Sequence, residues 1–487
     1  MKGLRIRFRG PLSSLSAADR AQRLLERGAL QQLPLHRCVG AREARHEGRQ
    51  TRRRVRVTKV GRTHGRGRVG LRRVGPAGRV PATDDMVRTT SEAIIDVVRR
   101  EGDSALISLA REYDNVRLKS VEVPRDAWRD ALHALDPGVR AAMERAATNI
   151  RAVHSASLPQ TVEISPEPGV VVGRRPDPLR RVGVYAPGGR ASYPSSVLMG
   201  AIPARVAGVS EVIICSPPAP NGLPAAVTLA AAELSNADRV FAVGGAGAIA
   251  AMAYGTATIP RVDCIVGPGN AYVAQAKLLV ASAVAIDLPA GPTELVVIAD
   301  DSAKPARIAS EVLAQAEHDP DAVVVVLAVG EGVAEQVVAE IERLFEVQER
   351  RTIIERALSA RGAVLTAAST KDALGFANEI ASEHLLLATR DADALLADVR
   401  SAGTVFVGES SSVVFGDYMT GANHVLPTGG LARSYSGLST LDFVRWTTYQ
   451  RVDADGAARL SSDVAAFADS EQLPGHAAAA RMWRRST

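Results

Sequence analysis

Four histidines lie in polar segments beside carboxylates or amides, a setting typical of sites that bind metals or transfer protons. The segments are QAEHDP, SEHLLLA, GDYMTGANH and SEQLPGH, which contain His318, His384, His424 and His476. Imidazole nitrogens and carboxylate oxygens suit zinc, which binds about four ligands. A single histidine in such a setting is more often structural, but four of them together favour a shared site.

The segment IASEVLAQAEHDP predicts a helix that ends in its polar tail. Apolar residues recur at helical spacing up to Ala316, and Pro320 then prevents further helix. Gln315 and His318 are three residues apart, so their side chains leave the same face of the last turn. Both could bind one ion, with Asp417 and His476 completing the set. Glutamine is an uncommon zinc ligand, so spacing alone does not fix the ligands.

Glu383 and His384 are adjacent at the start of the apolar run HLLLAT, which predicts a buried strand. A histidine with a pKa near neutral can accept a proton from an alcohol, which accelerates such steps by roughly 10²–10⁴. The glutamate could activate water. The structural alternative is a glutamate at a helix end followed by a histidine, and this pair alone does not exclude it.

Three glycine-rich turns could bring backbone close to a ligand. GAGAIA at 245–250 has the spacing G-x-G-x-x-A of a dinucleotide-binding turn. Such a turn needs an acidic residue about 20 positions later at the end of the next strand. Asp263 has nearly that spacing but precedes CIVGPGN, so the match is poor. In GPGN at 267–270 the side chain of Asn270 could bind a ligand, and YAPGG at 185–189 is a further turn of this kind.

From residue 181 onward, short β-rich runs alternate with helical segments that would position these residues. RVGVYAP, EVIICSPP, RVFAVGG and CIVGPGN predict a first α/β unit over 181–290, and ELVVIAD, AVVVVLAV, GAVLTA, HLLLAT and GTVFVG predict a second over 291–408. Such alternation indicates parallel sheets covered by helices. The expected fold class is α/β, with two doubly wound, Rossmann-like units plus small helical N- and C-terminal pieces. Ligands of such sheets gather beyond the carboxyl ends of strands.

The ends of the chain differ from these units. Residues 83–180 are expected to form an N-terminal helical segment, and 409–487 a loop-rich and then helical C-terminal segment. Residues 1–82 carry 22 Lys and Arg against 4 Asp and Glu, although the whole chain carries 59 against 53. The basic charge thus belongs to this extension, which is expected to be disordered or to reflect a wrongly assigned start. Nucleic-acid binding, membrane attachment and a transit peptide are the alternatives.

Three scattered cysteines are too few for a disulfide framework or a thiolate metal site. No window approaches the roughly 20 apolar residues of a membrane span. The sequence therefore indicates a cytoplasmic protein without membrane attachment.

Nine segments occur in the order found in histidinol dehydrogenases, and the chain resembles that family from about residue 90 to its C-terminus. They are RVGVYAPGG, VDCIVGPGNAYVAQAK, DLPAGPTELVVIAD, LAQAEHDP, SEHLLLATRDA, SAGTVFVG, GDYMTGANHVLPTGG, SGLSTLDF and SEQLPGHAAA. The family oxidises L-histidinol to L-histidine with water and two NAD⁺, in the last steps of histidine biosynthesis. The basic extension is outside the resemblance.

The resemblance implies a role for each matching residue. Glu383 and His384 would be catalytic, the histidine as base toward the hydroxyl group and the glutamate as activator of water. Zinc would hold the substrate through its imidazole and amino nitrogens and would be bound by Gln315, His318, Asp417 and His476. The same four residues would contact the substrate, together with His384, Thr293 (usually serine in the family) and Glu471. His424 would be a further residue of the substrate pocket.

The resemblance also implies where NAD binds and how the chain assembles. Tyr185 and Asn270 match cofactor-contacting positions, whereas Gly247 replaces a glutamine that touches NAD in many members. The family forms a homodimer in which a short C-terminal segment enters the partner's site. Glu471 and His476 would therefore act in the partner subunit.

Two other functions fit parts of the pattern. A related zinc dehydrogenase of another polar alcohol, such as a sulfopropanediol, would share the zinc ligands and the Glu–His pair, although Glu471 suits an amino group better than a sulfonate. A nucleic-acid-binding protein with a degenerate enzyme body would use the basic extension, but that segment lacks interleaved aromatic residues apart from Phe8. Metal-dependent hydrolysis is a third possibility.

Overall fold

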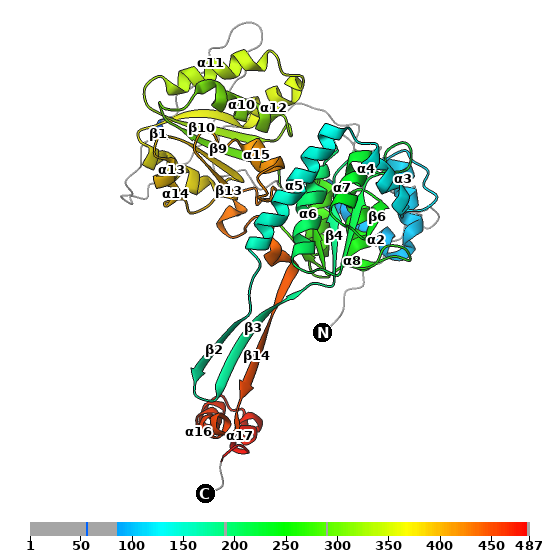
Figure 1. Cartoon of the computed structure of the whole chain (residues 1–487), viewed down its shortest axis with the longest axis vertical. Coiled ribbons are helices and arrows are strands. Elements are labelled where there is room, and N and C mark those ends of the chain that lie inside the picture. Colours follow the sequence, from blue (N-terminus) through cyan, green and yellow to red (C-terminus); the bar gives the residue numbers. More distant parts are fainter. Residues whose placement is uncertain (1–54, 57–84, 189–191, 289–290, 485–487) are drawn as a thin grey trace, which may run out of the picture. The chain divides into compact units, whose positions relative to one another are not determined.

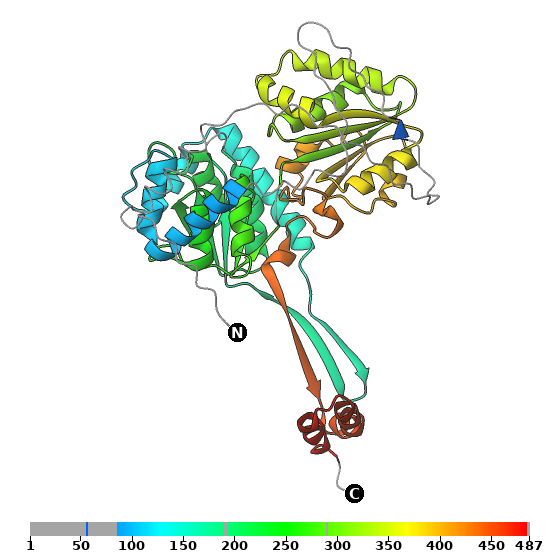
Figure 2. The same ribbon diagram turned by 180° about the vertical axis from the view of Figure 1, so that it is seen from behind.

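The computed structural model describes residues 55–56, 85–188, 192–288 and 291–484. The predicted α/β class is confirmed, because two sheets of mainly parallel strands are each covered by helices on both faces (Figures 1 and 2). Of the basic extension, only the short strand β1 (Val55–Arg56) is described, and the rest of that prediction lies outside the described residues. No helix in the described part of the chain is both long and apolar enough to cross a membrane.

The first sheet is wholly parallel and has the order β6-β5-β4-β7-β8. Alternate residues of its strands face two separate cores, as the two-residue period of a strand requires. Even-numbered residues such as Val182 pack with α4 to α7, and odd-numbered residues such as Ile213 pack with α2, α3, α8 and α9. The strands are β4 (Arg181–Tyr185), β5 (Glu211–Ser216), β6 (Arg239–Ala242), β7 (Cys264–Val266) and β8 (Ala285–Ile286).

Eight helices of the described part of the chain cover this sheet. They are α2 (Asp85–Glu101), α3 (Asp103–Tyr113), α4 (Arg125–His133), α5 (Pro137–Ala156), α6 (Pro194–Val206), α7 (Ala226–Leu234), α8 (Gly245–Tyr254) and α9 (Ala271–Val280). The Ala-rich helices α7 and α8 are apolar over most of their surface, which fits their burial against the sheet.

The second sheet has the order β1-β11-β10-β9-β12-β13, in which β1 pairs antiparallel with β11 and the others are parallel. Its strands are β9 (Glu294–Ala299), β10 (Val323–Val329), β11 (Gly362–Ala367), β12 (His384–Ala388) and β13 (Thr404–Val407). The strand β10 is apolar along its whole length because helices cover both of its faces.

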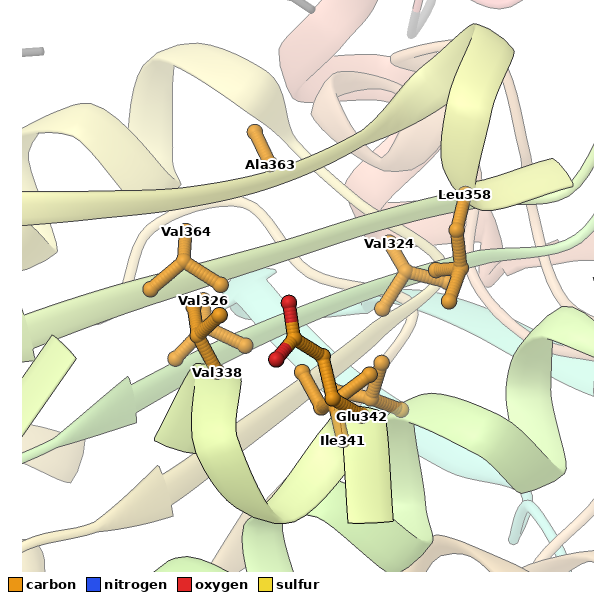
Figure 3. A pocket seen from close by; sticks show the side chains of 9 residues that line it. Val324, Val326, Val338, Ile341, Glu342, Leu358, Ala363 and Val364 are labelled. Carbon is orange, nitrogen blue, oxygen red and sulfur yellow. The ribbon is translucent and has the colours of Figure 1, made fainter. Parts of the chain in front are cut away.

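Helices α10 to α12 cover one face of the second sheet, and α13 and α14 cover the other (Figures 1 and 2). Their bounds, with that of the short α15, are α10 (Pro305–Ala316), α11 (Val333–Phe345), α12 (Arg351–Arg361), α13 (Thr370–Ile380), α14 (Ala392–Leu396) and α15 (Val413–Tyr418). A small cavity lies between this sheet and helices α11 and α12 (Figure 3). Its lining is apolar apart from Glu342 and contains none of the predicted site residues, so the cavity belongs to the core.

A third sheet, antiparallel and of order β14-β3-β2, was not predicted. It joins β2 (Val162–Glu167) and β3 (Val170–Pro178), at the end of the segment expected to be helical, to β14 (Val444–Val452) near the C-terminus. All six residues of β2 are exposed, and its apolar alternation is limited to Val162 and Ile164 before Pro166, which is too short a pattern to predict a strand. The C-terminal helices α16 (Ala454–Ser470) and α17 (Pro474–Arg481) follow β14 and pack on each other.

Candidate active site

Helix α10 positions the two residues that were predicted to share a metal ion. It ends at Ala316, so Gln315 lies in its last turn and His318 lies just beyond it. The Gln315 side chain is buried, whereas His318 is exposed in the single chain. The carboxyl end of a helix carries partial negative charge, which favours a bound cation. The location and the donor types both fit the predicted metal site.

Thr293, Glu383 and His384 lie at the start of the neighbouring strands β9 and β12, which pair in parallel. Their site is therefore at the amino edge of the second sheet. The expectation that ligands gather beyond carboxyl ends of strands is wrong for this unit. The reason is that α10 connects the parallel strands β9 and β10 and therefore runs in the opposite direction to them. Its last turn, which carries Gln315, thus lies at the amino edge, next to the side chains at the starts of β9 and β12.

The two ring nitrogens of His384 have different surroundings. Nδ1 lies 3.1 Å from the backbone oxygen of Glu294, which can only accept, so Nδ1 carries the proton and donates. Nε2 is buried, has no hydrogen-bond partner among the described residues and lies 3.7 Å from Asp417 Oδ1. Burial lowers the pKa of His384, and Asp417 opposes this effect. The neutral ring thus presents an unprotonated Nε2 that can accept a proton.

Glu383 is buried next to this ring, with Oε2 3.5 Å from His384 Nδ1. Its Oε2 accepts hydrogen bonds from the Thr293 hydroxyl and from the backbone N–H of Glu294. Burial raises the pKa of Glu383 to about 7, although both hydrogen bonds act in the opposite direction. A carboxyl group with this pKa can take up and release a proton near neutral pH.

Asp417 lies near the end of α15 and faces His384. Burial raises its pKa to about 6, while His384 lowers it. Although His318 is partly exposed, the protein packed around its ring lowers its pKa by desolvation, whereas Glu317 raises it and His384 lowers it further. His424 Nδ1 lies 3.0 Å from the backbone oxygen of Asp417, so this ring holds the end of α15. The structure therefore brings Thr293, Gln315, His318, Glu383, His384, Asp417 and His424 into one region of a single chain.

Glu471 and His476 are not part of this region in the single chain. Glu471 follows α16, His476 lies in α17, and both side chains are exposed. Among the described residues, no group of three or more His, Cys, Asp or Glu side chains could hold a metal ion. The proposed four-ligand set is consequently incomplete in one chain, as expected if the fourth ligand comes from a partner.

One supporting residue was missed in the sequence. Glu311 of α10 accepts from the backbone N–H of Val413 at 3.1 Å and from the Ser412 hydroxyl, at the start of α15. It therefore ties the helix that carries Gln315 to the helix that carries Asp417. The signal was available, because Glu311 precedes Gln315 by four residues and so lies on the same face of α10.

The residues matched to NAD contacts lie at the other sheet, at its carboxyl edge. Tyr185 ends β4, and its buried hydroxyl accepts from the backbone N–H of Gly245 at 3.1 Å. Burial raises the pKa of Tyr185 to about 12. Asn270 is exposed and caps α9, with Oδ1 accepting from the N–H groups of Tyr272 and Val273 at 3.1 Å. Its amide nitrogen is left for another partner, so the two positions fit a ligand at this edge.

Gly247 is buried in α8, where other members of the resembled family often have glutamine. A Cβ at this position would lie 3.1 Å from Leu109 Cδ1 and 3.4 Å from Leu106 Cδ2. The glycine therefore allows α3 to pack closely on α8. A leucine side chain occupies the space that a longer residue would need.

Comparisons with known proteins agree with this geometry. The family model for histidinol dehydrogenase matches residues 78–484. A histidinol dehydrogenase of Methanosarcina barkeri is 45% identical over 399 residues, which are 82% of this chain and 92% of the relative. One from Natronomonas pharaonis is 50% identical over 391 residues, covering 80% and 92%. The crystal structure of a histidinol dehydrogenase from Elizabethkingia anophelis has a TM-score of 0.79 at 34% identity, covering 82% and 92%.

Proposed function

Because the chain belongs to the histidinol dehydrogenase family, we propose that it oxidises L-histidinol through L-histidinal to L-histidine and reduces two NAD⁺. The cytoplasm is the expected compartment of this biosynthetic reaction. The observation that carries the proposal is the unprotonated Nε2 of His384, buried beside Glu383 and Asp417 at the end of α10.

The donor set at this edge fits a zinc ion. Gln315, His318 and Asp417 come from one subunit, and His476 of the partner subunit is the proposed fourth ligand. Bound zinc would hold the substrate through its imidazole and amino nitrogens. Thr293 and Glu471 are the proposed additional substrate contacts, with Glu471 suited to the amino group.

His384 is the proposed base of the first oxidation. Its Nε2 accepts the proton of the substrate hydroxyl while hydride leaves the same carbon for the nicotinamide of NAD⁺. The contact between Nδ1 and the Glu294 carbonyl fixes the ring so that this nitrogen remains the acceptor. The products of this step are the aldehyde, NADH and a protonated His384.

Glu383 is the proposed base of the second stage. It removes a proton from water as the water oxygen adds to the aldehyde carbon, and protonated His384 returns its proton to the former carbonyl oxygen, which gives a hydrate. The hydrate then loses a proton to His384, which has released its first one, and a hydride to a second NAD⁺. The aldehyde must stay in the site between the two steps, because a free aldehyde would react elsewhere.

Exposed apolar side chains support the proposed homodimer. Phe467 in α16 is 70% exposed, and Met482 and Trp483, just after α17, are 82% and 64% exposed. Several large apolar side chains exposed on one pair of packed helices are typical of a surface that another protein covers. The same pair of helices, with the turn between them, carries Glu471 and His476, so a second copy of this chain would use it to complete the site.

The decisive experiment combines an assay with metal analysis. The purified protein should form two NADH per L-histidinol and contain zinc, and dihydroxypropanesulfonate should give no NADH. NADH formation from the sulfonate alone would favour the related alcohol dehydrogenase. Hydrolase turnover without NADH would favour metal-dependent hydrolysis.

A further inference from the structure

The hydroxyl group of Thr293 joins Gln315 to Glu383. Thr293 Oγ1 donates to Glu383 Oε2 and accepts from Gln315 Nε2. Glu383 Oε2 also accepts from the backbone N–H of Glu294 at 2.9 Å. The groups therefore form one continuous chain of hydrogen bonds that begins at Gln315 and ends on the carboxylate.

The direction of each bond follows from the donors available. The carboxylate form of Glu383 has no proton to donate, so its Oε2 accepts from both the Glu294 N–H and the Thr293 hydroxyl. The single hydroxyl proton of Thr293 is used toward that oxygen. Oγ1 can consequently only accept from Gln315, so the amide nitrogen of Gln315 faces Thr293. Its carbonyl oxygen, on the other branch of the planar amide, faces away and has no donor among the described residues.

This orientation matters for a glutamine that binds a cation. The oxygen and nitrogen ends of the amide have similar size, so shape alone does not select between them. Only the oxygen can ligate a metal, because the nitrogen lone pair is delocalised and its protons would face the cation. We propose that Thr293 is a positioning residue that turns the carbonyl oxygen of Gln315 toward the zinc ion. The inference rests on the zinc site of the proposed function.

The surroundings make this bond chain rigid. Gln315 is buried at the end of α10, and Glu383 is buried at the start of β12. Thr293 precedes β9, the strand between β10 and β12. Its β-branched side chain has few χ1 rotamers, which keeps the hydroxyl in place. Groups that orient metal ligands in this way commonly change metal affinity by 10- to 100-fold when they are removed.

The test measures zinc affinity of the metal-stripped, full-length protein by competition with a chromophoric chelator. Thr293→Val should bind zinc roughly 10- to 100-fold more weakly than wild type. Thr293→Ala, which removes the hydroxyl without a second methyl group, should behave in the same way. Thr293→Ser keeps the hydroxyl and should lose about threefold at most, through its greater rotamer freedom.

A second background separates orientation from packing. Gln315→Glu has two equivalent oxygens and therefore no wrong end, so adding Thr293→Val to it should change zinc affinity by no more than about twofold. Unchanged affinity of Thr293→Val, or an equal loss in both backgrounds, would overturn the inference. Failure of the wild-type protein to bind zinc would instead refute the proposed zinc site.

Discussion

His384 is the residue on which the proposed chemistry depends most directly. Its Nδ1 is held by the Glu294 carbonyl, and its Nε2 is the free base. We expect His384→Asn to reduce turnover by roughly 10²–10⁴, the usual contribution of a general base. Zinc content should remain that of wild type, because His384 is not a proposed ligand. Steady-state NADH formation and metal analysis measure the two quantities, and unimpaired turnover would refute the assignment.

We expect the buried His154 to make folding stability depend on pH. It is buried in α5, and neither ring nitrogen has a hydrogen-bond partner among the described residues. Burial lowers its pKa from the ordinary value of 6.5. The unfolded chain therefore takes up a proton at a higher pH than the folded one. Stability is fully present above pH 6.5 and is lost as the pH falls toward the folded-state pKa.

Replacing the imidazole should remove this dependence. We expect His154→Leu to be less sensitive to acid than wild type. The free energy of unfolding of the variant minus that of wild type should therefore increase from pH 7.5 to pH 5.5. Urea unfolding at both pH values measures it. An equal shift of wild type and variant with pH would show that His154 does not titrate on unfolding.

The turn between β7 and α9 is held by a buried ion pair. Lys277 and Asp287 contact each other and are almost inaccessible to solvent. Asp287 Oδ2 accepts from the Gly267 N–H at 2.7 Å, and Lys277 donates to the Gly267 oxygen at 3.1 Å. Gly267 itself has φ of +115°, and a Cβ there would lie 2.1 Å from the Tyr185 oxygen. The pair thus fixes the turn that presents Asn270.

Breaking this pair should be costly. Lys277→Met leaves Asp287 buried without its cation, so we expect the free energy of unfolding to fall by about 3–5 kcal/mol. The double variant Lys277→Met with Asp287→Leu removes the stranded charge and should recover part of the loss. Urea unfolding of the three proteins tests this, and a single variant as stable as wild type would contradict it.

The elements differed in how well the sequence predicted them. The strands β9, β10 and β12 and the end of α10 followed from apolar runs and from Pro320. The sequence did not predict which edge of the second sheet carries the site. Hydrophobic periodicity indicates which segments are helices or strands, but not at which edge of the sheet their ends come together. The third sheet was missed in part because β14 pairs with β3, a strand far from it in the sequence, as Thr447 does opposite Arg175. The NAD-contacting positions and the metal ligands remain predictions from the resemblance.

At the scale of the whole molecule, the site should require two chains. His384 and His476 belong to different regions of one subunit, so a mixed dimer of His384→Asn and His476→Asn subunits would contain one site with neither substitution. With random pairing, about one quarter of all sites should be intact, and activity should recover to that fraction of wild type. The unfractionated co-expressed protein tests this fraction, and mixed dimers purified through two affinity tags, which hold one intact site of two, should have about half of wild-type activity. Purified mixed dimers without activity would place His476 in the site of its own subunit.

The C-terminal helices are attached through a paired ladder rather than a flexible linker. β14 is in register with β3 along all nine residues, from Val444 opposite Pro178 to Val452 opposite Val170. Each residue adds about 3.4 Å to such a ladder. The length of the two strands therefore sets the position of the C-terminal helices. Removing two facing residues from each strand would shift His476 by roughly 7 Å along the ladder, while every remaining side chain would stay on the same face of the sheet. The length of this ladder therefore sets how far from the first sheet His476 can reach.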